Sequence, residues 1–117
     1  VMDFVPDEEV AELHEASDVA VSARGDGGTS GSLILALTLG TPVIAAATAG
    51  NRELTGDGRA GWHFVPRSVD SLGDTLRAAS SDTRLRDDKA RCAAQLAAVT
   101  PWEEIARETA RLLKRPR

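Results

Sequence analysis

Residues 30–50 read SGSLILALTLGTPVIAAATAG, and this stretch decides the fold class. Residues 33–39 form an uncharged apolar run that predicts a buried helix, which Gly40 ends. Residues 42–47 are short and apolar, and they predict a buried strand. The turn at 40–42 breaks the apolar run after about seven residues, whereas a membrane span needs roughly 20. The stretch is therefore a helix, a turn and a strand of a folded domain.

The sequence on either side of this stretch repeats the alternation of strands and helices. Upstream, strands are expected at 1–5 and 18–23, with a helix from Pro6 to about Ala16 between them. Downstream, residues 48–54 (TAGNREL) are expected to form a flexible loop, 56–61 (GDGRAG) a turn, and 62–66 a strand. Three helices follow: one capped by Ser68 with apolar positions Val69, Leu72, Leu76 and Ala79, one at 83–99, and one at 101–114.

Short strands joined by helical connections favour parallel pairing, because a parallel crossover needs a dozen or more residues. The expected fold is α/β, a Rossmann-like parallel sheet flanked by helices. Ligands of such sheets bind at the carboxyl ends of the strands, which here are the loops after Ala23 and Ala47, with the loop after Val65 as a further candidate. Four expected strands followed by three consecutive helices resemble the latter half of a doubly wound domain. Residues 1–117 are therefore interpreted as a single, partial domain.

The glycine-rich segment RGDGGTSGS at residues 24–32 connects an expected strand to the apolar helix. Glycines let a backbone approach a ligand closely, and the first amides of a helix have no partners within it. The segment thus predicts a diphosphate site, with a plain glycine-rich turn capped by Ser30 or Ser32 as the alternative. Arg24 either closes on a phosphate or is a solvated loop residue. The candidate diphosphate ligands are Arg24, Gly28, Thr29, Ser30, Gly31 and Ser32.

The remaining polar candidates carry weaker signals. Asn51, Arg52 and Glu53 follow the strand at 42–47 and could contact sugar hydroxyls, or they could begin a helix with solvent-facing charges. His14 and His63 are expected to be structural rather than general bases.

Composition excludes several classes of function. The chain has 14 basic and 18 acidic side chains, a net charge of −4, which argues against nucleic acid as a partner. One cysteine, Cys92, cannot form an internal disulfide, and with two histidines it cannot supply a structural zinc site. Cys92 is expected to be buried, and the absence of a recognisable signal peptide favours a reducing, cytoplasmic location. No metal or other cofactor is expected.

These motifs resemble a known family. The segments SGSLILALTLGTPVIAAATAGNREL, GRAGWHFVP and PWEEIA are similar to the C-terminal, nucleotide-sugar-binding domain of GT-B fold glycosyltransferases, most of all family four. The resemblance implies a UDP- or GDP-sugar donor bound without metal, its diphosphate held by the loop amides and the helix N-terminus. Gly50, Asn51 and Glu53, in the matching segment AGNREL, are weaker candidates for contacts with the sugar or the nucleobase. The resemblance places Phe4 and Val5 near the nucleobase, with a role in the core and turn as the alternative.

The chain departs from the family pattern at two positions. Family-four enzymes commonly carry two glutamates separated by seven residues, and the matching positions here are Gly27 and Leu35. Neither position can therefore take the role of the family's carboxylates, and the catalytic residues are unknown. The resemblance also implies a missing N-terminal acceptor domain that supplies the catalytic base, so this fragment alone is expected to be inactive. The final helix, 101–114, would pack back across the interdomain cleft.

The leading hypothesis is part of a glycosyltransferase that transfers a sugar to an acceptor hydroxyl. A non-catalytic nucleotide-binding or interaction module and a sugar-nucleotide epimerase are the alternatives. In the final helix, Trp102 is expected to be buried and the end around Leu112 and Leu113 more exposed. The basic residues of this helix leave open a peripheral contact with a membrane that carries a lipid acceptor.

Overall fold

The strand β2 (Val43–Ala46) lies at the centre of a parallel sheet, between β1 (Ala20–Ser22) and β3 (Gly61–Phe64). We describe a computed structural model, in which residues 5–23, 31–99 and 102–113 are placed well enough to describe. In that part of the chain the strand order is β1-β2-β3, with Ala20 beside Val43 and Val43 beside Gly61. The predicted α/β fold with a parallel, helix-flanked sheet is confirmed.

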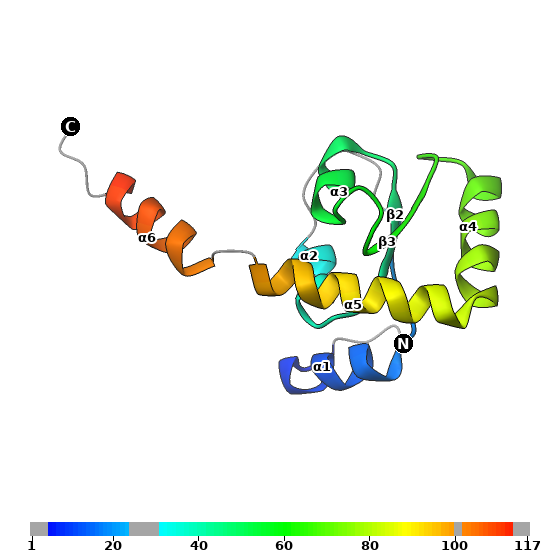
Figure 1. Ribbon diagram of the computed structural model, residues 1–117, viewed down its shortest axis with the longest axis horizontal. Helices are drawn as coiled ribbons and strands as arrows, with labels where there is room; N and C mark the ends of the chain where they lie inside the picture. Colours follow the sequence, from blue (N-terminus) through cyan, green and yellow to red (C-terminus); the bar gives the residue numbers. More distant parts are fainter. Residues whose placement is uncertain (1–4, 24–30, 100–101, 114–117) are drawn as a thin grey trace.

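Apart from α3, the helices occupy the expected places along the chain (Figure 1). They are α1 (Asp7–Ala16), α2 (Gly31–Thr38), α3 (Ala49–Leu54), α4 (Val69–Ser81), α5 (Thr83–Val99) and α6 (Trp102–Leu113). Gly40 follows α2 with a φ of +77°, the left-handed conformation in which helices commonly end at glycine. Of the strand expected at 1–5, residues 1–4 lie outside the described part of the chain, and Val5 precedes α1 without strand structure.

The core has two parts because successive residues of β2 point to opposite faces of the sheet. Val43 and Ala45 pack with Leu33 of α2 and Ala93 of α5 on one face. Ile44 and Ala46 pack with Phe64 and with Ala79 of α4 on the other face. All four residues of β2 are fully buried. Cys92, expected to be buried, is only partly buried and packs at the edge of the first cluster.

Residues 49–54 correct one expectation, since they form the helix α3 instead of a flexible loop. The Thr48 hydroxyl accepts a hydrogen bond from the Asn51 amide at 3.2 Å and so caps the helix. The Asn51 side chain is buried, and its Nδ2 donates to the Ala46 carbonyl at 3.0 Å. The alternative interpretation of this segment, a helix start, is the correct one.

The apolar positions expected on α4 are used only in part. Leu72 and Ala79, seven residues apart, lie on one row of the helix and pack toward the sheet. Val69 and Leu76 form the neighbouring row and stay exposed, Val69 to 84%. The Ser68 cap is confirmed, because its hydroxyl accepts from the Ser71 amide at 3.0 Å.

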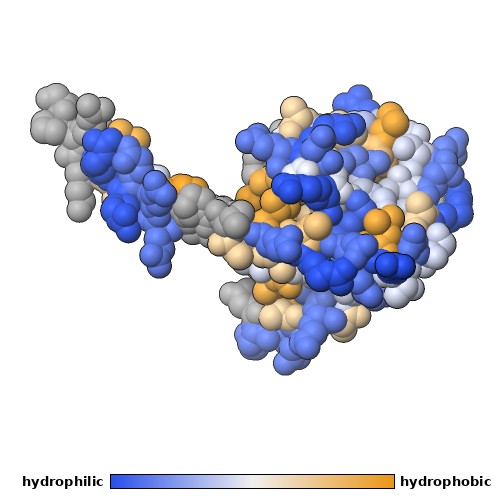
Figure 2. Space-filling model, viewed as in Figure 1, coloured by the Kyte–Doolittle hydropathy of each residue, from blue (hydrophilic) through white to orange (hydrophobic). Residues whose placement is uncertain are grey.

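Helix α6 projects away from the rest of the chain in Figures 1 and 2. As expected, its end is exposed, Leu112 to 49% and Leu113 to 82%. The Trp102 side chain lies outside the described residues, so its expected burial stays a prediction. Among the described residues, none of the helices has the length and apolar character needed to cross a bilayer.

Two glycines of this fold should respond very differently to alanine. At Gly61 a Cβ would collide with the Val43 carbonyl oxygen and lie 2.9 Å from Val43 Cγ2, so Gly61→Ala forces β2 and β3 apart. At Gly40 a Cβ would meet only Ala94 at 3.8 Å, leaving backbone strain as the cost. We expect Gly61→Ala to lower the free energy of unfolding by about 3 kcal/mol and Gly40→Ala by about 1 kcal/mol. Urea unfolding measures both, and equal losses would contradict the packing described.

Candidate functional site

Two helices begin at the edge of the sheet where the parallel strands end. α2 follows β1 after the segment 24–30, and α3 follows β2 directly. Because β1 and β2 run parallel, their carboxyl ends lie at the same edge, and so do the starts of both helices. The expectation that Gly31 and Ser32 lie at a helix N-terminus after a parallel strand is confirmed. Arg24, Gly28, Thr29 and Ser30 lie outside the described residues.

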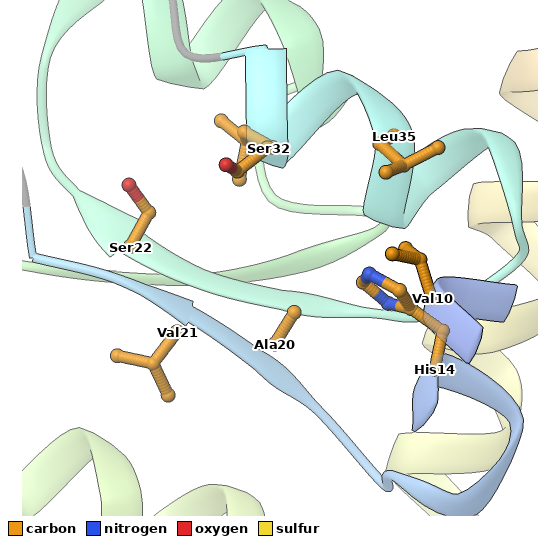
Figure 3. Close-up of a pocket in the computed structure, with 8 residues that line it drawn as sticks. Val10, His14, Ala20, Val21, Ser22, Ser32 and Leu35 are labelled. Carbon is orange, nitrogen blue, oxygen red and sulfur yellow. The ribbon is translucent and has the colours of Figure 1, made fainter. Parts of the chain in front are cut away.

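A cavity of about 370 Å³ runs between α1, β1 and α2 (Figure 3). The hydroxyl-bearing side chains of Ser22 and Ser32 lie at one end, and Val10, His14 and Leu35 gather at the other (Figure 3). A mostly apolar lining with a few polar groups at one end is typical of small-molecule sites. Leu35, at one of the two positions where the family commonly has glutamate, contributes only an apolar wall.

The N-terminus of α2 has the general features of an anion site. The first amides of a helix have no partners within it, and the helix dipole places partial positive charge there. A Cβ added to Gly31 would meet no atom of the described residues within 4 Å, so these residues leave space beside the backbone. The first turn of α2 contains no acidic side chain. The geometry thus fits a phosphate next to Gly31 and Ser32.

The residues expected near a sugar lie on α3, and they differ in exposure. Glu53 is exposed and Gly50 is partly buried. Asn51 is only 4% exposed, and its Nδ2 is engaged by the Ala46 carbonyl, so it ties α3 to the end of β2. Val5, expected near a nucleobase, is partly buried just before α1, and Phe4 lies outside the described residues.

Sequence reasoning missed a polar cluster beneath α3. Thr55 is fully buried, and its Oγ1 lies 3.0 Å from Nε2 of His63 on β3. The same oxygen lies 2.9 Å from the Asn51 carbonyl, 3.2 Å from the Arg52 carbonyl and 3.3 Å from the Gly58 amide nitrogen. The only signal in the sequence was a threonine between an apolar residue and a glycine-rich turn, which does not identify a partner eight residues away.

Lys89 of α5 contacts the glycine-rich turn between Thr55 and β3. Its Nζ donates to the carbonyls of Gly58 at 2.6 Å and Gly61 at 2.8 Å, and it lies 5.0 Å from the centre of the Trp62 ring. Burial lowers the pKa of the Lys89 ammonium below its ordinary value. Lys89 therefore ties α5 to the turn that precedes β3.

Burial also lowers the pKa of His63, and the positive charges of Arg52 and Lys89 act in the same direction. The Asn51 carbonyl and the Asp57 carboxylate oppose this shift but do not reverse it. His63 is thus held as a neutral ring, as expected of a structural histidine. Among the described residues, His, Cys, Asp and Glu form no group of three that could bind a metal ion.

Comparison with known proteins gives the family. The family model described as "Glycosyl transferases group 1" matches residues 1–96. The chain belongs to the group 1 glycosyltransferases. It is 35% identical over 78 residues to a D-inositol 3-phosphate glycosyltransferase of Nocardioides sp., an alignment that covers 67% of this chain and 17% of that protein. The resemblance to the C-terminal domain of GT-B glycosyltransferases is confirmed at the level of the family.

The fold of this glycosyltransferase chain also matches a solved structure. Sucrose-phosphate synthase of Thermosynechococcus elongatus superposes with a TM-score of 0.83 and 22% sequence identity. The match covers 94% of this chain and 28% of the synthase. The chain therefore spans about a sixth of the curated relative and about a quarter of the structural one, and the second comparison shows the fold alone.

The lowered pKa of His63 predicts a dependence of stability on pH. Well above pH 6.5, the ordinary pKa of histidine, neither the folded nor the unfolded chain protonates it appreciably, and its contribution is fully present. As the pH falls from about 6.5 through the lowered pKa, the unfolded chain binds a proton that the folded chain resists, so stability is lost.

We expect this loss to be smaller in His63→Gln, which keeps a donor at the same place but does not titrate. Urea unfolding of both proteins at about pH 7.5 and about pH 5.5 measures the difference. His14→Gln is the matched control. A pH dependence that is the same in the wild type and His63→Gln would show that His63 does not carry it.

Proposed function

We propose that this chain is the donor-binding part of a glycosyltransferase that takes a sugar from a UDP- or GDP-sugar and transfers it to an acceptor hydroxyl. The observation that carries the proposal is the N-terminus of α2 at Gly31 and Ser32, placed at the hydroxyl-bearing end of the cavity. Membership of the group 1 glycosyltransferases supports the reaction class.

The diphosphate binds at the N-terminus of α2. Backbone amides of the segment 28–32 donate to its oxygens, the hydroxyls of Thr29, Ser30 and Ser32 add further donors, and Arg24 supplies a positive charge. In the transfer, the bond between the anomeric carbon and the diphosphate oxygen breaks, the acceptor oxygen bonds to that carbon, and the proton of the acceptor hydroxyl passes to a base. Negative charge builds up on the departing diphosphate, and fixed amides at a helix end stabilise it without a metal ion.

The sugar and the nucleoside extend in two directions from the diphosphate. The sugar lies beside α3, the helix that begins at the same edge of the sheet and carries Gly50 and the exposed Glu53. Asn51 contributes there indirectly, because its hydrogen bond to the Ala46 carbonyl holds α3 against the end of β2. The nucleobase lies toward Phe4 and Val5.

Acceptor binding and the catalytic base come from parts of the protein beyond these 117 residues. The chain spans only 17% of the curated relative, and α6 exposes Ile105, Leu112 and Leu113. These apolar residues of α6 pack across the cleft against the acceptor domain. Where the acceptor is a lipid, the arginines of α6 approach the anionic membrane surface. The protein is otherwise cytoplasmic.

The Gly31 site can be tested by substitution. Gly31→Asp places a carboxylate where the backbone meets phosphate, and at about 4 Å like charges repel by roughly 1 to 4 kcal/mol. We expect affinity for UDP or GDP to fall at least about tenfold. Glu53→Ala should change it less, and Gly31→Ala, which meets no neighbouring atom, should leave folding intact.

The measurement is calorimetric titration of the full-length protein with UDP, GDP, UDP-glucose and GDP-mannose. Equal effects of Gly31→Asp and Glu53→Ala would count against the diphosphate site. Binding of a sugar nucleotide with no transfer to any acceptor would favour the non-catalytic module instead.

A further inference from the structure

The hydrogen bonds of Thr55 fix the tautomer of His63. A hydroxyl has one hydrogen to donate, and the carbonyls of Asn51 and Arg52 can only accept. The Thr55 hydrogen is therefore directed to these carbonyls, and Oγ1 accepts from the Gly58 amide and from His63. The proton of the neutral His63 ring is thus on Nε2, and the ring acts as a donor.

This pair completes a polar connection that runs across the carboxyl edge of the sheet. Nδ2 of Asn51 bonds to Ala46 at the end of β2, the Asn51 carbonyl accepts from Thr55, and Thr55 accepts from His63 on β3. α3 is therefore fastened to β2 at its start and to β3 at its end. A helix of six residues is not stable alone, so its orientation depends on such ties.

We propose that Thr55 and His63 are positioning residues for the donor sugar, holding α3 at the angle that presents Gly50 and Glu53 to it. The inference rests on the proposed function, in which α3 contacts the sugar and α2 the diphosphate. The inference assigns binding of the nucleoside diphosphate and binding of the sugar to different helices. The nucleoside diphosphate depends on α2, whereas the additional affinity contributed by the sugar depends on the Thr55–His63 pair.

Packing alone does not account for a threonine at this place. Valine has nearly the same shape, and it would fill the buried space without needing partners. In Thr55→Val the His63 Nε2–H and the Gly58 amide lose their acceptor, while the helical bond from the Thr55 amide to the Asn51 carbonyl, 3.1 Å, is kept. The substitution therefore removes the tie to β3 with little change of volume.

The test compares two affinities in the full-length protein, that for UDP-glucose and that for UDP, with GDP-mannose and GDP as the second pair. We expect Thr55→Val to weaken sugar-nucleotide binding roughly fivefold to tenfold. This is the change in affinity if the free energy of one buried hydrogen bond is lost entirely from the binding free energy. Affinity for UDP or GDP should stay within about twofold. Amide hydrogen exchange of peptides covering 49–58 should become faster in the same variant.

Two further variants make the result specific. Thr55→Ser keeps the hydroxyl and should restore both the affinity and the slow exchange. Lys89→Met removes the tie between α5 and the same turn, so it should lower stability while leaving the ratio of the two affinities unchanged. His63→Gln, with an amide donor, should bind sugar nucleotide more tightly than His63→Leu.

The outcomes distinguish this inference from the proposed function. If the wild-type protein binds none of the four nucleotides, the proposed function fails and the positioning role fails with it. If the wild type binds a sugar nucleotide more tightly than the nucleotide alone and Thr55→Val keeps that ratio, only the positioning role is overturned. Equal loss of affinity for the nucleotide and the sugar nucleotide would also overturn it, because that pattern shows a general structural defect.

Discussion

Burial of β2 on both faces is the constraint on which the rest of this structure depends. A strand that pairs in parallel on both sides and is covered on both faces must be apolar throughout, and Val43, Ile44, Ala45 and Ala46 meet that demand. It also demands a glycine opposite Val43, because the Val43 carbonyl occupies the space of a side chain at Gly61. Once these pairings form, the carboxyl ends of the strands share one edge, and the helices that follow must start there.

The two helices that start at this edge are fixed by different physics. α2 is held by apolar packing, with Leu33 and Ala36 almost wholly buried. α3 is held by hydrogen bonds to β2 and from β3, through Asn51 and Thr55. Apolar packing tolerates small shifts, whereas hydrogen bonds fix direction. A helix N-terminus beside a tightly oriented short helix suits a ligand with an anionic part and a part that must be aligned.

The sequence predicted those features that local pattern determines. The bounds of α5, 83–99, and the end of α2 at Gly40 follow from periodicity and from the conformational freedom of glycine. The helix α3 was only the alternative interpretation of its segment, because its stability comes from Asn51 and the Ala46 carbonyl of β2, a contact that propensity does not reveal. The two rows of α4 could not be told apart, since the side of the stripe that meets the sheet depends on how the helix is placed.

Parts of the site that consist of residues adjacent in the sequence could be predicted, whereas parts that need contacts between separate elements could not. Gly31 and Ser32 were found because a strand, a glycine-rich segment and an apolar helix follow one another in the sequence. The cavity beside them needs α1 to lie along β1, and the Thr55–His63 pair needs β3 to lie beneath α3. Both depend on contacts between elements, so no window of the sequence contains them.

The charge of the chain shows why local fields must do the binding. A net charge of −4 repels an anionic donor at long range, but at physiological ionic strength such repulsion is screened beyond about 8 Å. An anionic group in contact with the first turn of α2 is too close to the helix end for salt to screen their attraction in this way. α4 begins with Asp70 and α6 with Glu103 and Glu104, acidic residues that satisfy the positive ends of their own helices. The first turn of α2 contains no acidic side chain, as in α3 and α5, so no side chain of its own first turn opposes an anion there, and in the proposed function the dipole of α2 faces the diphosphate.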